Sequence, residues 1–377
     1  MQRARTSTRR TTTRAVALAT LCLAFALAPG RAEAAPPGVV STRHLSMGNA
    51  SRASATGGSA ALINPAGMGL VPTFTIEPAY QVRIENQTHG AAVTAMDSLN
   101  NKRLAIGLTY AFMYGSPQAI YNDQNGLEET LRLQHLGHEA GLSIGVVVVP
   151  GWLLIGVRPK YQFTSLRFND PDGVQVDANE TLSAFGLDAS LQLLFRGFVS
   201  VTAVGYNLAG AHQAAWTDSR PLTLDPLPVD YSSLDPSNVS RISDYPRTFA
   251  HGLAVFPTRS PGFSINFDGT YDFSSYWDQD LDGDGQGDRW ARITLGGGAE
   301  YTIGPVPIRV GGYWDRRGPA PDDDRGYITG GVGFIQGTPQ KGGAGVDVGV
   351  GFSRQIAGPN PETFIGAHVG ILINPRL

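Results

Sequence analysis

A two-residue hydrophobic period runs through the sequence from about residue 73 to its end. At 263–273 the odd positions are mostly Phe, Ile and Tyr, whereas the even positions are mostly Ser, Asn, Asp and Thr. The same split recurs at 184–195 and 344–352. Such alternation predicts strands with one apolar and one polar face. The chain is therefore expected to be all-β.

Continuing this pattern predicts fourteen strands, and many of them are about 10 residues or longer. Strands of that length suit a tilted crossing of a bilayer. An even number of strands fits a closed bacterial barrel. The expected strands start near residues 73, 88, 102, 136, 152, 182, 198, 247, 262, 290, 305, 326, 343 and 362.

The connections between the expected strands alternate between short and long. The short set comprises 97–102, 149–151, 196–197, 258–261, 304–305 and 336–342. The longer, more polar set includes 115–134, 169–180, 209–246, 277–289 and 316–325. Short periplasmic turns with long outer loops are typical of outer-membrane barrels, whereas a soluble sandwich has no reason to sort its loops. We predict an antiparallel transmembrane barrel over 73–377 in the outer membrane of a Gram-negative bacterium, in contact with its lipid.

Residues 1–35 are interpreted as a signal peptide. Arginines precede an apolar run, which ends at a small-residue cleavage site. The only cysteine, Cys22, lies in this leader, so the mature chain is expected to have no thiol, disulfide or cysteine-based metal site. Removing the leader also removes six arginines but only one acid, Glu33, which leaves an acidic chain without a nucleic-acid footprint. No later apolar stretch is long enough for a membrane-spanning helix.

The segment 36–72 is rich in Ser, Ala, Asn and Gly, with little charge and no helical or strand period. We interpret it as a hatch inside the barrel. Small residues suit packing against a polar wall, and Asn or Ser side chains can satisfy a backbone that lacks regular structure. Pro65 biases Asn64 toward an extended conformation. The alternative interpretation is a flexible mature N-terminus.

This segment resembles the N-terminal signature of the FadL-type fatty acid transporters and their PorV-like relatives. The matching stretches are 45–50 (LSMGNA), 59–62 (SAAL) and 64–68 (NPAGM), and two later stretches, 245–257 and 312–334, also resemble the family. The resemblance implies a fourteen-stranded barrel with a hatch in its lumen. It assigns the hatch motif to Asn64, Pro65, Ala66 and Gly67.

The resemblance further implies passive uptake of hydrophobic small molecules, such as long-chain fatty acids or hydrocarbons. They are captured by outer loops and released sideways when the hatch shifts, and a gap in the wall near strands two to four would favour this function. The main alternative is a PorV-like barrel that docks secreted or envelope proteins without small-molecule transport. A barrel-embedded lipid hydrolase is a third reading.

Two outer connections carry apolar residues that suit a capture site. We predict ligand capture by the longest connection, through Trp216, Leu222, Leu224, Leu227 and Tyr231. The alternative is that these side chains pack on one another as a cap over the barrel. Leu127 and Leu131, one helical turn apart, are expected to join the same surface.

Charged residues on the polar faces are expected to point into the lumen. A charge facing lipid near mid-bilayer would cost about 2 to 4 kcal/mol. Paired charges that connect the wall and the hatch are favoured over substrate contacts, and interleaved glycines leave space for the hatch or for close backbone approach. The expected inward charges are Glu77, Arg83, Arg103, Glu139, Arg158, Lys160, Asp188, Asp268, Asp272, Arg292, Glu300, Arg309 and Asp347, and the glycines include Gly296, Gly298, Gly331, Gly333, Gly345 and Gly349.

Little in the sequence points to bound metal or to catalysis. Asp280, Asp282, Asp284 and Asp288 have the spacing of a calcium loop, but position twelve is Ala291 rather than glutamate. Structural calcium and a solvated acidic loop remain equal alternatives, and no cofactor is required. The Gly-x-Ser-x-Gly string at 141–145 lies inside a strand pattern without the turn and helix of a nucleophile elbow. We predict that the protein is not an enzyme.

Overall fold

The computed structural model describes residues 41–374, apart from 86, 100, 116–117, 123–127, 170–179, 211–246, 261, 273–291, 317–323, 337–342 and 359–360. The predicted signal peptide lies outside these residues. Among the described helices, none has the length and apolar character needed to cross a membrane.

Four short helical elements precede a series of strands. The helical elements are α2 (Thr42–Ser46), η1 (Arg52–Ser54), α3 (Gly57–Ile63) and η2 (Pro65–Gly69). The strands are β1 (Phe74–Arg83), β2 (Thr88–Asp97), β3 (Leu104–Gly115), β4 (Gln118–Asn122), β5 (Glu128–Val149), β6 (Leu153–Asn169), β7 (Glu180–Phe195), β8 (Val199–Gly210), β9 (Thr248–Val255), β10 (Phe263–Asp272), β11 (Arg292–Ile303), β12 (Val306–Arg316), β13 (Arg325–Gln336), β14 (Gly343–Ala357) and β15 (Thr363–Asn374).

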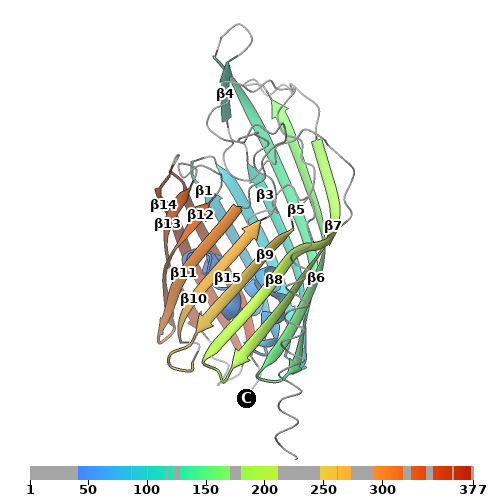
Figure 1. Cartoon of the computed structure of the whole chain (residues 1–377), viewed down its shortest axis with the longest axis vertical. Coiled ribbons are helices and arrows are strands. Elements are labelled where there is room, and N and C mark those ends of the chain that lie inside the picture. The colour runs from blue at the N-terminus through green and yellow to red at the C-terminus, as the bar shows by residue number, and fades with distance from the viewer. Residues whose placement is uncertain are drawn as a thin grey trace, which may run out of the picture. The chain divides into compact units, whose positions relative to one another are not determined.

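The strands close into an antiparallel ring (Figure 1). Neighbours in the chain pair with each other, β1 pairs with β15, and β3 pairs with β5 to complete the circle. The short β4 pairs only with β5, so it forms a hairpin beyond the end of β3 rather than a place in the ring. Closure therefore uses fourteen strands, which confirms the predicted barrel.

Thirteen of the fourteen ring strands begin within two residues of the position that the alternation predicts. The exception is β5, which begins at Glu128 rather than near 136. The prediction of a loop at 115–134, with Leu127 and Leu131 on one helical turn, was wrong. Leu131 is a strand residue that pairs with Ala119 in the β4–β5 hairpin, and Leu127 lies outside the described residues. The alternation over the first residues of β5 is too short for the sequence pattern to distinguish this strand end from a loop.

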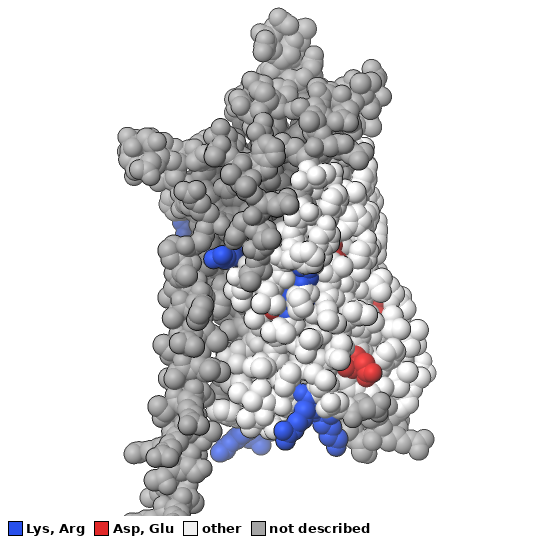
Figure 2. All heavy atoms as spheres, turned by 90° about the vertical axis from the view of Figure 1, so that its right-hand side faces the viewer, with Lys and Arg blue, Asp and Glu red and all other residues white. Residues whose placement is uncertain are grey.

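The two faces of each strand separate by polarity as predicted. Phe185 and Phe267 on the outer face are 68% and 54% exposed, whereas the neighbouring Asp188 and Asn266 on the inner face are fully buried. Figure 2 shows one outer face that is mostly uncharged, with scattered charged side chains in its middle, an acidic group lower down, and Lys and Arg gathered at its lower end. A sandwich would bury its apolar faces between two sheets. An apolar outside around a polar lumen is the arrangement of a barrel that spans a bilayer.

We predict that a charge on the outer face destabilises the folded barrel. Val350 lies at the middle of β14 and is 49% exposed on the outer face. Val350→Lys places an ammonium group in hydrocarbon and is expected to lower the free energy of unfolding from lipid vesicles by about 2 to 4 kcal/mol. The control, Val350→Leu, is expected to change it little. Equal stability of the two variants would contradict a lipid-facing position for β14.

Candidate functional site

Residues 41–70, here called the N-terminal segment, fill the inside of the ring. The α2 helix contacts β12–β15, η1 contacts β8–β10, α3 contacts β1–β3, and η2 contacts β3 and β5–β7. Met47 and Gly48 lie against glycines of β11. The segment therefore reaches all fourteen strands, and its blue helices lie within the ring in Figure 1. It contains short helical turns where no regular structure was expected, because three to seven residues are too few to show a period.

Asn64 joins two parts of the N-terminal segment to the wall. It is fully buried between α3 and η2, with φ −157° and ψ 85°. Its Nδ2 donates to the carbonyl of Arg52 and to Oε1 of Gln192, both at 2.9 Å. The next residues follow the same wall, because the amide of Ala66 donates to Oγ of Ser190 at 2.8 Å. The predicted motif is thus a point of contact with β7.

Two glycine positions allow the backbone of the N-terminal segment to approach the wall. A Cβ on Gly156 of β6 would collide with the backbone of Pro65 and Ala66. Gly48 has φ +66°, and a Cβ there would collide with the backbone of Gly312. A side chain at either position is incompatible with this packing. Gly296, Gly298 and Gly331 also face the segment as predicted. Gly333 allows close approach of the Val348 carbonyl, which is the predicted alternative, and Gly349 faces the side chain of His368.

Glu300 of β11 anchors α2. Both of its carboxylate oxygens accept from the Arg43 guanidinium at 3.0 Å, and Oε2 also accepts from Nε of Arg309 at 2.6 Å. Burial alone would lower the pKa of Arg43, but the nearby Glu300 carboxylate outweighs burial and the pKa is raised. Separating such a buried pair would leave each charge buried without its partner, so the contact between α2 and the wall resists separation.

Asp268 of β10 anchors η1 in the same way. Its Oδ2 accepts from the amides of Ser51 and Arg52, at 3.0 and 2.9 Å, and from Nη1 of Arg52 at 3.2 Å. Nε of Arg52 donates to the hydroxyl of Tyr206 on β8, which in turn donates to the carbonyl of Ile63 at 2.6 Å. This side of the N-terminal segment is therefore held by charge-assisted hydrogen bonds.

The α3 side is held differently. Ala60, Ala61 and Ile63 pack with Met96 of β2 and Ala105 of β3 in one apolar cluster. Two hydrogen bonds reach the α3 backbone from other strands: Oγ of Ser143 on β5 donates to the carbonyl of Ala61 at 2.7 Å, and the hydroxyl of Tyr206 on β8 donates to that of Ile63 at 2.6 Å. The start of α3 at Gly58 lies against Thr94 and Glu77, whereas its later residues contact β2 and β3 through small apolar side chains.

The largest charged cluster of the described wall is internally paired. Arg158 Nη2 lies 2.8 Å from both Glu139 and Asp188, and Lys160 Nζ lies 3.3 and 3.0 Å from the same two carboxylates. All four side chains are buried. Two cations and two anions leave no net charge, so this cluster joins β5, β6 and β7 rather than presenting a free charge to a ligand. The inward position predicted for Arg103 was wrong, because it precedes β3 in a turn and is exposed.

The wall is continuously paired near strands two to four. The β2–β3 register runs without a break from His89 opposite Tyr114 to Asp97 opposite Ile106, and the β3–β5 register is also unbroken. Pairing is less regular elsewhere, and the register shifts between Val147 and Val149, between Leu187 and Ala189, and between Gly326 and Tyr327. Pro78 interrupts the β1–β15 pairing and Pro159 interrupts the β5–β6 pairing, since proline has no amide to donate to a ladder.

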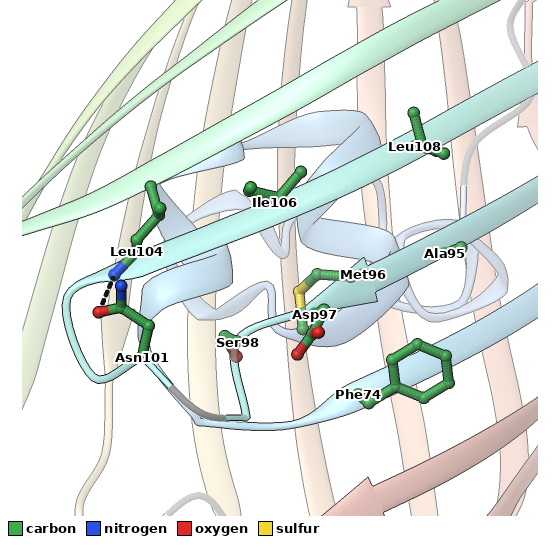
Figure 3. A pocket seen from close by; sticks show the side chains of 9 residues that line it. All are labelled: Phe74, Ala95, Met96, Asp97, Ser98, Asn101, Leu104, Ile106 and Leu108. Carbon is green, nitrogen blue, oxygen red and sulfur yellow. Dashed lines mark hydrogen bonds between the residues drawn. The ribbon is translucent and has the colours of Figure 1, made fainter.

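A cavity of about 410 Å³ lies beside β1–β3, near their short-turn ends (Figure 3). Leu104, Ile106 and Leu108 give it an apolar side that faces outward, and a turn closes one edge. Met96 belongs both to this cavity and to the apolar cluster under α3. No sequence signal marks it, because strands and a turn form it together. Its lining is Phe74, Ala95, Met96, Asp97, Ser98, Asn101, Leu104, Ile106 and Leu108.

Comparison with solved structures identifies this architecture. A FadL homologue from Pseudomonas aeruginosa is 12% identical with a TM-score of 0.57, covering 90% of this chain and 99% of that chain. The toluene transporter TbuX from Ralstonia pickettii is 13% identical with a TM-score of 0.57, covering 89% and 98%. The monoaromatic hydrocarbon channel CymD is 12% identical with a TM-score of 0.57, covering 90% and 98%. The chain has the FadL-type fold. No family model and no curated protein matches the sequence.

The FadL-type fold and the apolar outer face place the protein in the outer membrane of a Gram-negative bacterium, as predicted. Two of the named structures are described as a toluene transporter and a monoaromatic hydrocarbon channel, and none of the three is described as an enzyme.

Several predicted site residues of this FadL-type barrel lie outside the described residues. They are the capture residues Trp216, Leu222, Leu224, Leu227 and Tyr231, and the calcium-loop residues Asp280, Asp282, Asp284 and Asp288. Within the described ranges, no group of three His, Cys, Asp or Glu side chains is arranged to hold a metal ion. Both predictions therefore remain predictions.

We predict that Asn64→Ala loosens the N-terminal segment without unfolding the barrel. The change leaves buried acceptors on Arg52 and Gln192 without this donor, at a cost of about 1 to 3 kcal/mol. A nitroxide on Thr56→Cys, the single thiol expected in the mature chain, is expected to show a larger mobile fraction by electron paramagnetic resonance. The control is Asn266→Ala, a buried wall residue that bonds Ser264 of its own strand. An unchanged spectrum for Asn64→Ala would refute the anchoring role.

His44 gives the N-terminal segment a predicted dependence on pH. It is buried and bonds Oγ of Ser51 at 2.9 Å. Burial, followed by the charges of Arg52 and Arg43, lowers its pKa well below the ordinary 6.5. Because the released imidazole binds a proton more readily, packing is strongest above about pH 6.5 and weakens as pH falls below that value. The Thr56→Cys nitroxide should become more mobile with acidification, and His44→Gln should flatten this response. An equal response in both proteins would exclude His44 as the cause.

Proposed function

We propose that this FadL-type barrel mediates passive uptake of small hydrophobic molecules, such as long-chain fatty acids or hydrocarbons, across the outer membrane. The fold supports this proposal, since its solved examples include a toluene transporter and a monoaromatic hydrocarbon channel. The N-terminal segment reaches every strand of the ring, so cargo can pass only if part of it moves. In this proposal the segment acts as the hatch, and Asn64–Gly67 form one of its fixed points.

The main support for the proposal is that different parts of the hatch are attached to the wall by different kinds of contact. The α2 and η1 elements are held by buried ion pairs with Glu300 and Asp268, and their separation would expose unpaired charges. The α3 helix rests on an apolar contact with Met96 and Ala105. A hydrophobic molecule can replace apolar contacts of this kind with apolar contacts of its own. Cargo is therefore expected to pass between α3 and β1–β3.

Sideways release on this side is part of the proposal. The cavity outside β1–β3 shares Met96 with the apolar cluster under α3, which supports an exit nearby. Because the β2–β3 and β3–β5 pairings are continuous, release here requires local opening of the wall. Capture by Trp216, Leu222, Leu224, Leu227 and Tyr231 would supply the outer end of the same route.

A reversible disulfide tests the moving part. A Cβ on Gly107 of β3 would lie 3.1 Å from Cβ of Ala61, so a shift of a few tenths of an ångström brings the pair to the separation found in disulfides. Ala61→Cys with Gly107→Cys is expected to reduce uptake of radiolabelled toluene or oleate by whole cells when it is oxidised. Reduction should restore uptake because it frees α3.

The matched comparison fixes the η2 side instead. A Cβ on Gly145 would lie 3.5 Å from Cβ of Met68 but 2.7 Å from the carbonyl oxygen of Pro65. Met68→Cys with Gly145→Cys therefore links η2 to β5 after a small shift of η2, and its reduced form serves as its own reference. This disulfide is expected to affect uptake less than the α3 disulfide. Equal uptake by oxidised and reduced α3-linked protein would refute hatch gating. Equal uptake by cells with and without the protein would refute transport, and specific capture of an envelope or secreted protein would then support a docking barrel.

A further inference from the structure

Exposed basic side chains gather at the short-turn end of the barrel. Lys102 and Arg103 lie in the β2–β3 turn, Arg196 lies in the β7–β8 turn, and Arg259 lies in the β9–β10 turn. In the described part of these turns and the strand ends beside them, Asp97 is the one carboxylate. Figure 2 shows Lys and Arg side chains at this lower end of the barrel. The rim therefore carries net positive charge, although the mature chain is acidic.

The two ends of the barrel differ in how their cations are partnered. At the long-loop end, Arg354 pairs with Glu85 at 3.0 Å and Arg292 pairs with Asp315 at 2.6 Å. At the short-turn end, the side chains of the four basic residues make no ion pair or hydrogen bond within the described part of the chain. Their charge is thus available to a partner outside the protein.

Two of these arginines occupy positions where the backbone favours glycine. Arg196 has φ 51° and Arg259 has φ 53°, both in the left-handed region. Glycine adopts this conformation without steric cost, whereas arginine does not. The turns therefore carry arginine at positions where turn geometry alone would select glycine.

Exposed aromatic side chains next to these arginines indicate how deep the arginines lie relative to the membrane. Phe195, at the end of β7, is 42% exposed, and Phe198, which follows Gly197 in the turn, is 43% exposed. The amide of Arg259 donates to the carbonyl of Phe256 at 2.9 Å. Aromatic girdles mark the boundary between hydrocarbon and headgroups. A guanidinium one to three residues beyond such a ring lies at the level of lipid phosphates.

We propose that the short-turn rim, Lys102, Arg103, Arg196 and Arg259, binds anionic phospholipid headgroups in the inner leaflet of the outer membrane. Guanidinium groups bind phosphate through paired N–H donors. The arginines follow the lipid-facing aromatics of the wall, which favours a lipid over a soluble acidic protein as the partner. Binding would fix the height and tilt of the barrel at its periplasmic edge.

The positive φ values provide a substitution that removes charge without harming the turn. Arg196→Gly with Arg259→Gly deletes both guanidinium groups and relieves both left-handed residues. The full mature protein in detergent, given equal amounts of phosphatidylglycerol and phosphatidylcholine, is expected to retain the anionic lipid preferentially in native mass spectra. At low salt this preference should fall by about fivefold for each arginine removed. Thermal stability should be maintained or increased.

The matched control is Gln87→Gly, because Gln87 is exposed with φ 51° in a turn at the opposite rim. It relieves the same kind of strain without changing charge and is expected to keep the lipid preference. A wild-type protein without preference, or a double variant with an undiminished preference, would overturn the proposal. Loss of polyglutamate binding in the double variant, with lipid preference unchanged, would assign the rim to an acidic protein and also overturn it.

Discussion

The structure depends on the need to pair every strand edge inside a bilayer. Hydrocarbon offers no water to a free amide or carbonyl, so an open sheet edge is excluded there. The β1–β15 and β3–β5 pairings remove both edges and determine the ring. Once the ring is closed, alternate side chains must face either lipid or the lumen. The polar lumen is thus a consequence of closure and not a separate feature.

A polar lumen of this size needs an occupant or solvent, and the N-terminal segment fills it. Small residues in the segment and glycines in the wall allow close backbone approach, as at Gly48 and Gly156. Wall carboxylates then accept hydrogen bonds from backbone amides that have no partner within a helix, as Asp268 does from Ser51 and Arg52. The wall supplies partners that short helices cannot supply for their own first amides.

The distribution of contact types gives the occupant a fixed side and a releasable side. Ion pairs concentrate at α2 and η1, and apolar contacts concentrate at α3. Charged contacts resist replacement by a hydrophobic molecule, whereas contacts among Ala, Ile and Met do not. This asymmetry links the packing of the lumen to the proposed transport of hydrophobic cargo.

The sequence by itself determined the strand positions, the polarity of both faces and the motif that contacts β7. A period of two is a local property of consecutive residues, so thirteen strand starts could be read to within two residues. Only the tertiary structure decided which wall residue holds which part of the N-terminal segment. Asp268 and Arg52 are 216 positions apart, and the cavity at Met96 joins strands and a turn. Such contacts depend on closure of the ring and its register, and these are set by pairing between distant segments rather than by local pattern.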